Sequence, residues 1–209
     1  MTSLWRRIVP LALALPLVGC ATATATATAT GQTADTSSGA TPTGVHLVST
    51  PGTLVDDMKL RPGQCHIKVI DQEKGTVLPD PACTPGAVDP AVTQENLQTT
   101  ICHGGYTKSV RPPVNITNPA KTASLKTYGL PYASTTEYDH LIPLELGGAS
   151  ATSNLWPETN TDTAVTVNNS KDDIENALNA AVCKGRVSLA AAQQAIASDW
   201  TTAKARLDL

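Results

Sequence analysis

The residues best suited to chemistry lie in one short stretch of the 209-residue sequence. Asp139 and His140 are adjacent, Pro143 follows them, and a Gly147-Gly148 turn comes before Asn154. An aspartate carboxylate is a hard oxygen ligand for a divalent cation, and a neutral imidazole near pH 7 can take a proton from an attacking water. Because many positions are specified at once, the pattern rarely arises by chance, and it predicts a metal-assisted hydrolytic site.

The backbone must position this pair. Successive side chains of a strand point to opposite faces, so Asp139 and His140 would diverge in a regular strand. A bend or a strand end is needed to bring both into one cleft. The segment Leu141-Ile142-Pro143 can supply that strand end.

At these residues the sequence resembles the HNH endonuclease family, over roughly 136–183. The resemblance implies an α+β fold with a ββα-metal core, in which a helix crosses a hairpin, together with flanking helices. It also implies an endonuclease that hydrolyses phosphodiester bonds of DNA with little sequence specificity. The implied cofactor is a divalent metal ion on Asp139, Mg²⁺ or Mn²⁺ with Zn²⁺ as the alternative, and His140 is the implied general base. A secreted bacterial subfamily is similar over about 84–207, through Thr100-Ile101-Cys102, Gly105-Tyr106-Thr107, Arg111-Pro112-Pro113 and the stretch 192–200.

Two further positions complete the site that the resemblance implies. Asn154 stitches the loop back to the first strand, because its amide both donates and accepts hydrogen bonds. The third metal-side residue belongs in the first turn of the crossing helix. Asn168 fits through its spacing to Lys171, and Asn169 is the alternative. The same asparagines would also suit a helix cap.

The charge of the chain excludes a protein that binds nucleic acid through bulk basicity, since 15 Lys and Arg face 18 Asp and Glu, a formal net charge of −3. Locally, no acidic residue lies between Glu95 and Glu137. A basic strip in that interval predicts weak, sequence-nonspecific contact with phosphates, and its alternative is an ordinary solvated surface. The strip consists of Lys108, Arg111, Lys121 and Lys126.

The N-terminus is typical of exported bacterial proteins. Residues 1–20 combine two early arginines with a short apolar run and end in Leu17-Val18-Gly19-Cys20, which resembles a lipoprotein lipobox acylated on Cys20. The alternative is a plain secretory signal. Residues 21–43 repeat Ala-Thr and cannot form a core, which predicts a flexible tether. We therefore expect an extracytoplasmic protein whose contact with the membrane is through the lipid alone.

Four cysteines remain after Cys20: Cys65, Cys83, Cys102 and Cys183. An even number in an exported protein predicts two disulfides, and none of the spacings is the C-x-x-C of a structural zinc site. Three pairings are possible. We favour Cys65–Cys83, within a small strand-and-turn unit, and Cys102–Cys183, between an early helix and a late one.

Periodicity and capping signals predict the elements. Residues 44–88 should form a small irregular β unit with a strand at 64–72, and residues 89–209 the HNH-like domain. Within that domain we expect helices near 90–102 and 119–128, a strand at 137–146 with a short return strand at 154–157, a helix with inward residues at 174–182, and a final helix over 189–207. The last two helices should pack antiparallel.

A function of another class fits the same residues. An envelope lipoprotein could keep the HNH-like scaffold as a binding module without turnover. An intact set of Asp139, His140 and Asn154 favours the enzyme, whereas net acidity and the open third ligand favour the binding module. No protein partner is evident. The other histidines, His46, His66 and His103, are expected to be surface or packing residues, and Trp156 is expected in the core.

Overall fold

The computed structural model describes residues 43–160 and 169–209, which belong to one compact unit spanning 37–209. The fold is α+β, as expected. The described strands are β1 (His46–Leu47), β2 (Lys68–Asp71), β3 (Thr76–Leu78), β4 (Ala87–Val88), β5 (Thr136–His140) and β6 (Leu155–Thr159). The described helices are α1 (Tyr106–Val110), α2 (Val114–Thr127), α3 (Ser170–Cys183), α4 (Leu189–Asp199) and α5 (Ala203–Arg206), with 3-10 turns η1 (Leu97–Thr99), η2 (Leu144–Leu146) and η3 (Trp200–Thr202).

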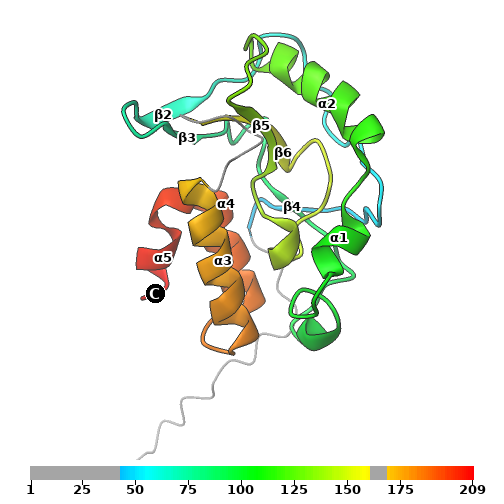
Figure 1. Cartoon of the computed structure of the whole chain (residues 1–209), viewed down its shortest axis with the longest axis vertical. Coiled ribbons are helices and arrows are strands. Elements are labelled where there is room, and N and C mark those ends of the chain that lie inside the picture. The colour runs from blue at the N-terminus through cyan, green and yellow to red at the C-terminus, as the bar shows by residue number, and fades with distance from the viewer. Residues whose placement is uncertain (1–42, 161–168) are drawn as a thin grey trace, which may run out of the picture. The chain divides into compact units, whose positions relative to one another are not determined.

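The antiparallel hairpin β5–β6 lies between α2 on one side and the α3–α4 pair on the other (Figure 1). Its register runs without interruption from Thr136 opposite Thr159 to His140 opposite Leu155. The expected strand at 137–146 is therefore only half right. The chain leaves the strand after His140, since Pro143 cannot donate a ladder hydrogen bond, and it forms η2 instead.

Two glycines close the loop after η2. Gly147 has a φ of 72°, in the left-handed region that favours glycine. A Cβ on Gly148 would lie 1.8 Å from the carbonyl oxygen of Ile142. Any side chain at Gly148 would therefore push the loop away from the end of β5, so this pair of glycines sets the shape of the site.

Helices α3 and α4 confirm the two late helices expected from periodicity. Helix α3 buries Leu178, Ala181 and Val182, and the Ser188 hydroxyl accepts a hydrogen bond from the Ala191 N–H at 3.2 Å at the start of α4. The last helix does not run continuously to 207, because the Asp199 carboxylate accepts the N–H of Thr201 at 3.0 Å. That local bond competes with the helix, and the chain continues as η3 and α5.

The helix expected near 90–102 is wrong, because only η1 forms there. Asp89 accepts from the Ala91 N–H at 2.9 Å, but it also accepts from the distant Thr50 N–H at 3.3 Å. Asn96 accepts from the Thr93 N–H at 2.9 Å. These side-chain bonds hold turns rather than a helix.

The helix expected near 119–128 is present but starts earlier. Helix α2 begins at Val114, directly after the Pro112-Pro113 pair, so that Pro119 lies inside it. A proline favours the first position of a helix, where its missing N–H costs nothing, and this preference explains the later start expected from the sequence. The ring of Pro119 is exposed, and the helix accepts the loss of one internal hydrogen bond.

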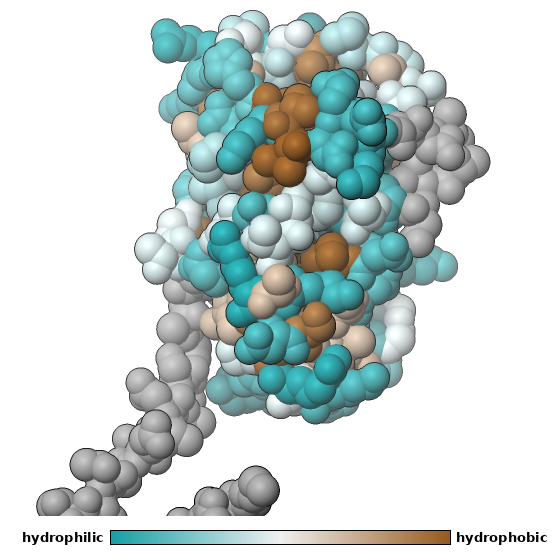
Figure 2. All heavy atoms as spheres, turned by 90° about the vertical axis from the view of Figure 1, so that its left-hand side faces the viewer, coloured by the Kyte–Doolittle hydropathy of each residue, from teal (hydrophilic) through white to brown (hydrophobic). Residues whose placement is uncertain are grey.

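Residues 44–88, expected as a unit of their own, lie in the same compact unit as 89–209. Strand β1 pairs in parallel with β4, and β2 and β3 form a hairpin on the left of Figure 1. Figure 2 shows that this side of the molecule is largely hydrophilic with apolar patches between. Val69 and Ile70 of β2 are among the exposed apolar residues.

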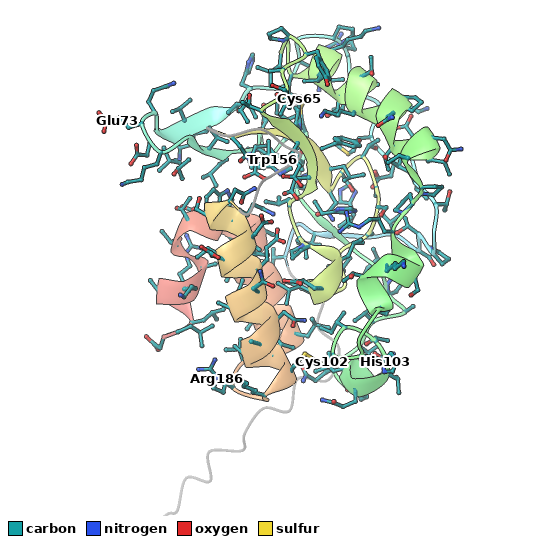
Figure 3. The ribbon with its side chains drawn as sticks, viewed as in Figure 1. Cys65, Glu73, Cys102, His103, Trp156 and Arg186 are labelled. Carbon is teal, nitrogen blue, oxygen red and sulfur yellow. A yellow bond between two sulfur atoms is a disulfide. The ribbon has the colours of Figure 1, made fainter. Side chains whose placement is uncertain are left out.

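The disulfides pair Cys65 with Cys83 and Cys102 with Cys183, the pairing favoured from the sequence. Figure 3 shows Cys102 beside the end of α3. Two disulfides fit a protein that folds in an oxidising compartment outside the cytoplasm. In the part of the chain that the structure describes, no helix has the length and apolar character to cross a membrane. The signal segment, Cys20 and most of the expected tether lie outside the described residues.

Candidate functional site

The end of β5 places Asp139 and His140 on opposite faces of the hairpin. Pairing with β6 continues through His140, and the Leu141 N–H still donates to the carbonyl oxygen of Asn154 at 2.8 Å. The bend expected to bring both side chains into one cleft is therefore absent from β5. We call the two sides of the strand the Asp139 face and the His140 face.

On the Asp139 face, the carboxylate meets a buried lysine from the first turn of α3. Lys171 Nζ lies 2.7 Å from Asp139 Oδ2 and donates to the carbonyl oxygen of His140 at 2.8 Å. It also forms an ion pair with Glu175, one turn further along α3. The Lys171 side chain is 1% exposed. This single ammonium therefore ties α3 to the end of β5.

More carboxylates surround Lys171 than it can neutralise. Burial, followed by the charge of Asp139, raises the pKa of Glu137 to about 7. Burial likewise raises the pKa of Glu158 and of Glu175, against the lowering effect of the Lys171 charge. Glu158 Oε2 is buried and has no hydrogen-bond partner among the described residues. The Asp139 face is thus an acidic cluster built around one cation.

On the His140 face, the imidazole lies among hydroxyl groups. His140 Nε2 is 3.0 Å from Ser150 Oγ, and the Ser150 N–H donates to Thr50 Oγ1 at 2.8 Å. His140 is 7% exposed, and burial lowers its pKa to about 4. The ring is therefore neutral near pH 7 and can accept a proton from a group that reaches it.

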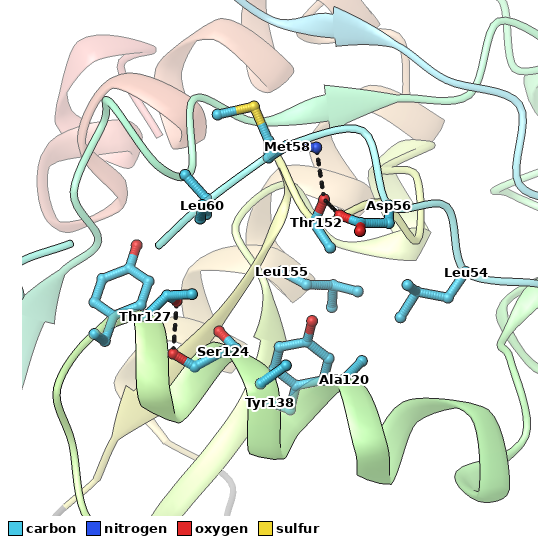
Figure 4. Close-up of a pocket in the computed structure, with 12 residues that line it drawn as sticks. Leu54, Asp56, Met58, Leu60, Ala120, Ser124, Thr127, Tyr138, Thr152 and Leu155 are labelled. Carbon is cyan, nitrogen blue, oxygen red and sulfur yellow. Dashed lines mark hydrogen bonds between the residues drawn. The ribbon is translucent and has the colours of Figure 1, made fainter. Parts of the chain in front are cut away.

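A pocket of about 230 Å³ lies beside the hairpin, between α2 and the segment 54–60 (Figure 4). Tyr138 and Leu155 bring it close to the end of the hairpin, because Tyr138 is two residues before His140 and Leu155 is opposite His140 in register. Most of its wall is apolar, and Asp56 and Thr152 add polar groups. The lining residues are Leu54, Asp56, Met58, Leu60, Ala120, Ala123, Ser124, Thr127, Tyr128, Tyr138, Thr152 and Leu155.

Asn154 closes the loop that follows β5. Its Oδ1 accepts from the Ile142 N–H at 2.9 Å, and its Nδ2 donates to the carbonyl oxygens of Ile142 at 2.9 Å and Ala149 at 2.8 Å. The side chain is fully buried. It therefore stitches the loop to the end of the first strand and positions the site rather than reacting in it.

Of the two asparagines expected as the third metal-side residue, the structure describes only Asn169. Asn169 is the N-cap of α3, where its Oδ1 accepts from the N–H groups of Lys171 at 2.8 Å and Asp172 at 3.0 Å. Asp172 in turn accepts from the Asn169 N–H at 2.9 Å, which completes a capping box. Asn168 lies outside the described residues.

The described donors do not fit a metal ion as they stand. The carboxylate of Asp139 is paired with Lys171, and the carbonyl oxygen of the Asn169 side chain is occupied by the helix cap. Across residues 43–160 and 169–209, no group of three or more His, Cys, Asp or Glu side chains is arranged to hold a metal ion.

Of the four residues of the basic strip, Lys121 is bound within the fold and the other three are exposed. Lys121 donates to the carbonyl oxygen of Thr136 at 2.5 Å, with its ammonium 5.6 Å from the centre of the Tyr132 ring. It is therefore engaged at the start of β5. Arg111 is exposed. Its charge adds to the lowering of the pKa of His140 and acts against the rise that burial causes in the pKa of Glu137. Lys108 and Lys126 are exposed in the last turns of α1 and α2.

Sequence reasoning missed three residues of the site: Lys171 and Glu175 on α3, and Ser150. Lys171 and Glu175 are four apart, and this spacing places them on one helix face. That signal was available, although it is equally common on solvated faces. Ser150 carries no local signal, since only the tertiary fold brings its hydroxyl to His140.

The other histidines were expected at the surface or in packing, and Trp156 in the core. His66 and His103 are exposed, and Trp156 is fully buried. His46 is partly exposed, and its Nδ1 lies 3.0 Å from Asp57 Oδ2.

Comparison with known proteins found no matching family model, no matching curated protein and no matching solved structure.

Proposed function

We propose that this chain is an extracytoplasmic nuclease of the HNH type, secreted or anchored through a lipid on Cys20, that hydrolyses DNA with little sequence specificity. The observation that supports it best is the local geometry of the hairpin. An antiparallel pair, β5–β6, carries adjacent Asp139 and His140 at its end, Asn154 stitches the loop, and the first turn of α3 lies against Asp139. The resemblance implies a hairpin crossed by a helix, and these contacts support that part of it, whereas Asp139 and His140 lie on opposite faces of β5 rather than in one cleft.

The chemistry assigned to this chain begins with His140. In the tautomer whose Nε2–H donates to Ser150 Oγ, the lone pair resides on Nδ1, and this neutral ring would take a proton from the water that attacks phosphorus. In this proposal Arg111, whose charge acts on His140, would contact a phosphate oxygen of the substrate. Because Asp139 is paired with Lys171, no step is assigned to a metal ion.

A plasmid-nicking assay on the purified chain tests the proposal, run with Mg²⁺, Mn²⁺ or Zn²⁺ and with chelator. His140→Ala should lower the cleavage rate by about 10²–10⁴-fold, because a general base is removed. His103→Ala is the matched control, since His103 is exposed. Nicking by His140→Ala at the rate of the unaltered chain would contradict the assignment.

A binding module without turnover is the second candidate. It is favoured by the ion pair that occupies Asp139 and by the deep burial of His140. Under this alternative, the chain binds DNA and slows its migration in a gel-shift assay at low salt. It cleaves no DNA under any of the metal conditions. Nicking that depends on His140 would exclude it.

A further inference from the structure

Three oxygen atoms converge on the Lys171 ammonium. Nζ is 2.7 Å from Asp139 Oδ2 and 2.8 Å from the carbonyl oxygen of His140, and Glu175 Oε1 is its third partner. Calcium takes oxygen ligands at about 2.3–2.6 Å, and carboxylates with a main-chain carbonyl are a common part of its donor set. A calcium ion at the position of Nζ would therefore need the oxygens of Asp139 and His140 to move inward by only a few tenths of an ångström.

The ammonium is held at this point from two sides. Its side chain is 1% exposed, and its backbone N–H is bound by the Asn169 cap at 2.8 Å. A side chain that starts in a capped first turn and ends on three oxygens has little freedom to swing away. Lys171 thus fills the space beside Asp139 in the folded chain.

The surroundings call for a cation. Asp139, Glu175 and Glu158 all act on Lys171 through their charges. Glu158 Oε2 adds a buried oxygen without a hydrogen-bond partner in the described part of the chain. Buried carboxylates are costly unless they are paired, protonated or bound to a metal. The Lys171 charge counteracts the cost of burying these carboxylates together.

We propose that the Lys171 ammonium is a built-in cation that takes the position beside Asp139 where the HNH resemblance places a divalent ion. The chain binds no divalent ion between Asp139 and α3 while Lys171 is present. Removal of the ammonium converts its three oxygen partners into a divalent-cation site. This inference goes beyond the proposed nuclease, because it concerns binding alone and holds whether or not DNA is cut.

Titration of the purified chain with Mn²⁺, with free Mn²⁺ followed by electron paramagnetic resonance, tests the inference. The unaltered chain and the control Lys184→Met, an exposed lysine at the other end of α3, should bind no Mn²⁺ at this site below about 1 mM. Lys171→Met should bind one equivalent of Mn²⁺ with a dissociation constant at least about tenfold below that 1 mM limit. The double variant Lys171→Met with Asp139→Asn should lose that binding.

Two outcomes would overturn the inference. One is an unaltered chain that binds one equivalent of Mn²⁺ and loses it in Asp139→Asn, a comparison that needs no Lys171 variant to fold. The other is a Lys171→Met protein that keeps the near-ultraviolet circular dichroism of the folded chain and binds no more Mn²⁺ than Lys184→Met. Neither outcome depends on cleavage, so a failure here is distinct from a failure of the nuclease proposal.

Discussion

The two faces of β5 differ in charge, although Asp139 and His140 are adjacent in sequence. On the Asp139 face, a buried lysine pairs with one carboxylate, and nearby carboxylates have raised pKa values. On the His140 face, the imidazole is buried among hydroxyl groups and its pKa falls to about 4. A single strand therefore separates a charged environment from a neutral one over one residue.

The difference teaches how burial acts on each kind of group. Burial disfavours the charged form, so it raises the pKa of an acid and lowers that of a histidine. An opposite charge at close range counteracts the effect of burial, as the Lys171 charge does for Glu137 and Glu158. The two faces should consequently respond to pH with opposite signs, and each can be broken separately.

The largest expected effect comes from removing the cation of the Asp139 face. Lys171→Met should lower the free energy of unfolding by about 3–5 kcal/mol, because it leaves buried carboxylates uncompensated. Lys184→Met, on the same helix but exposed, should change it by less than about 0.5 kcal/mol. Urea denaturation of both variants measures the contrast. Equal small changes would mean that Lys171 is not the centre of the cluster.

The His140 face should weaken on acidification. The pKa of His140 is about 4 in the folded chain and 6.5 as its ordinary value, so the unfolded chain binds more protons between these limits. Its contribution is complete above pH 6.5 and is lost as pH falls towards 4, by about 3 kcal/mol. Unfolding curves of the unaltered chain and His140→Asn across this window provide the check. Parallel pH dependence of the two proteins would show that the ring is not buried in its neutral form.

Asn169 separates a capping role from a metal role. Asn169→Ala should destabilise the chain by about 1 kcal/mol, because two N–H groups at the start of α3 lose their acceptor. Asn169→Asp should restore most of that stability, because aspartate is an equally good N-cap. Thermal unfolding of both variants decides between the roles. A loss that aspartate does not rescue would argue against a simple cap.

The smallest effect should come from Glu137, with the opposite sign to that of His140. Its pKa rises from 4.5 to about 7, so the folded chain binds more protons between these values and loses stability as pH rises through them. Solvent near this partly exposed group screens the effect to less than about 1 kcal/mol. Glu137→Gln should remove this fall, so the rise in stability that His140 gives between pH 4.5 and 6.5 should become slightly steeper in the variant. An unchanged slope in that variant would place the titrating group elsewhere in the cluster.

Local patterns predicted the elements that depend on local forces. Helices α3 and α4 were expected from apolar spacing and capping signals, and both were found. The pairing of the cysteines was also as favoured. The helix near 90–102 failed because Asp89 and Asn96 bond to other backbone groups, and Asp89 reaches as far as Thr50. No window of sequence contains that partner.

The candidate site divides in the same way. Residue types and spacing alone determined that Asp139, His140 and Asn154 would lie together at a hairpin end, because the glycines, the proline and strand alternation act within a few residues. Only the tertiary structure decided which face each side chain joins and what meets it there. Lys171 reaches Asp139 across 32 residues of chain, and Ser150 reaches His140 through a loop fixed by Asn154. In water each carboxyl and each imidazole titrates near the ordinary pKa of its own type. Burial removes that water, so the pKa of a buried group depends on distant partners that only the tertiary structure brings to it.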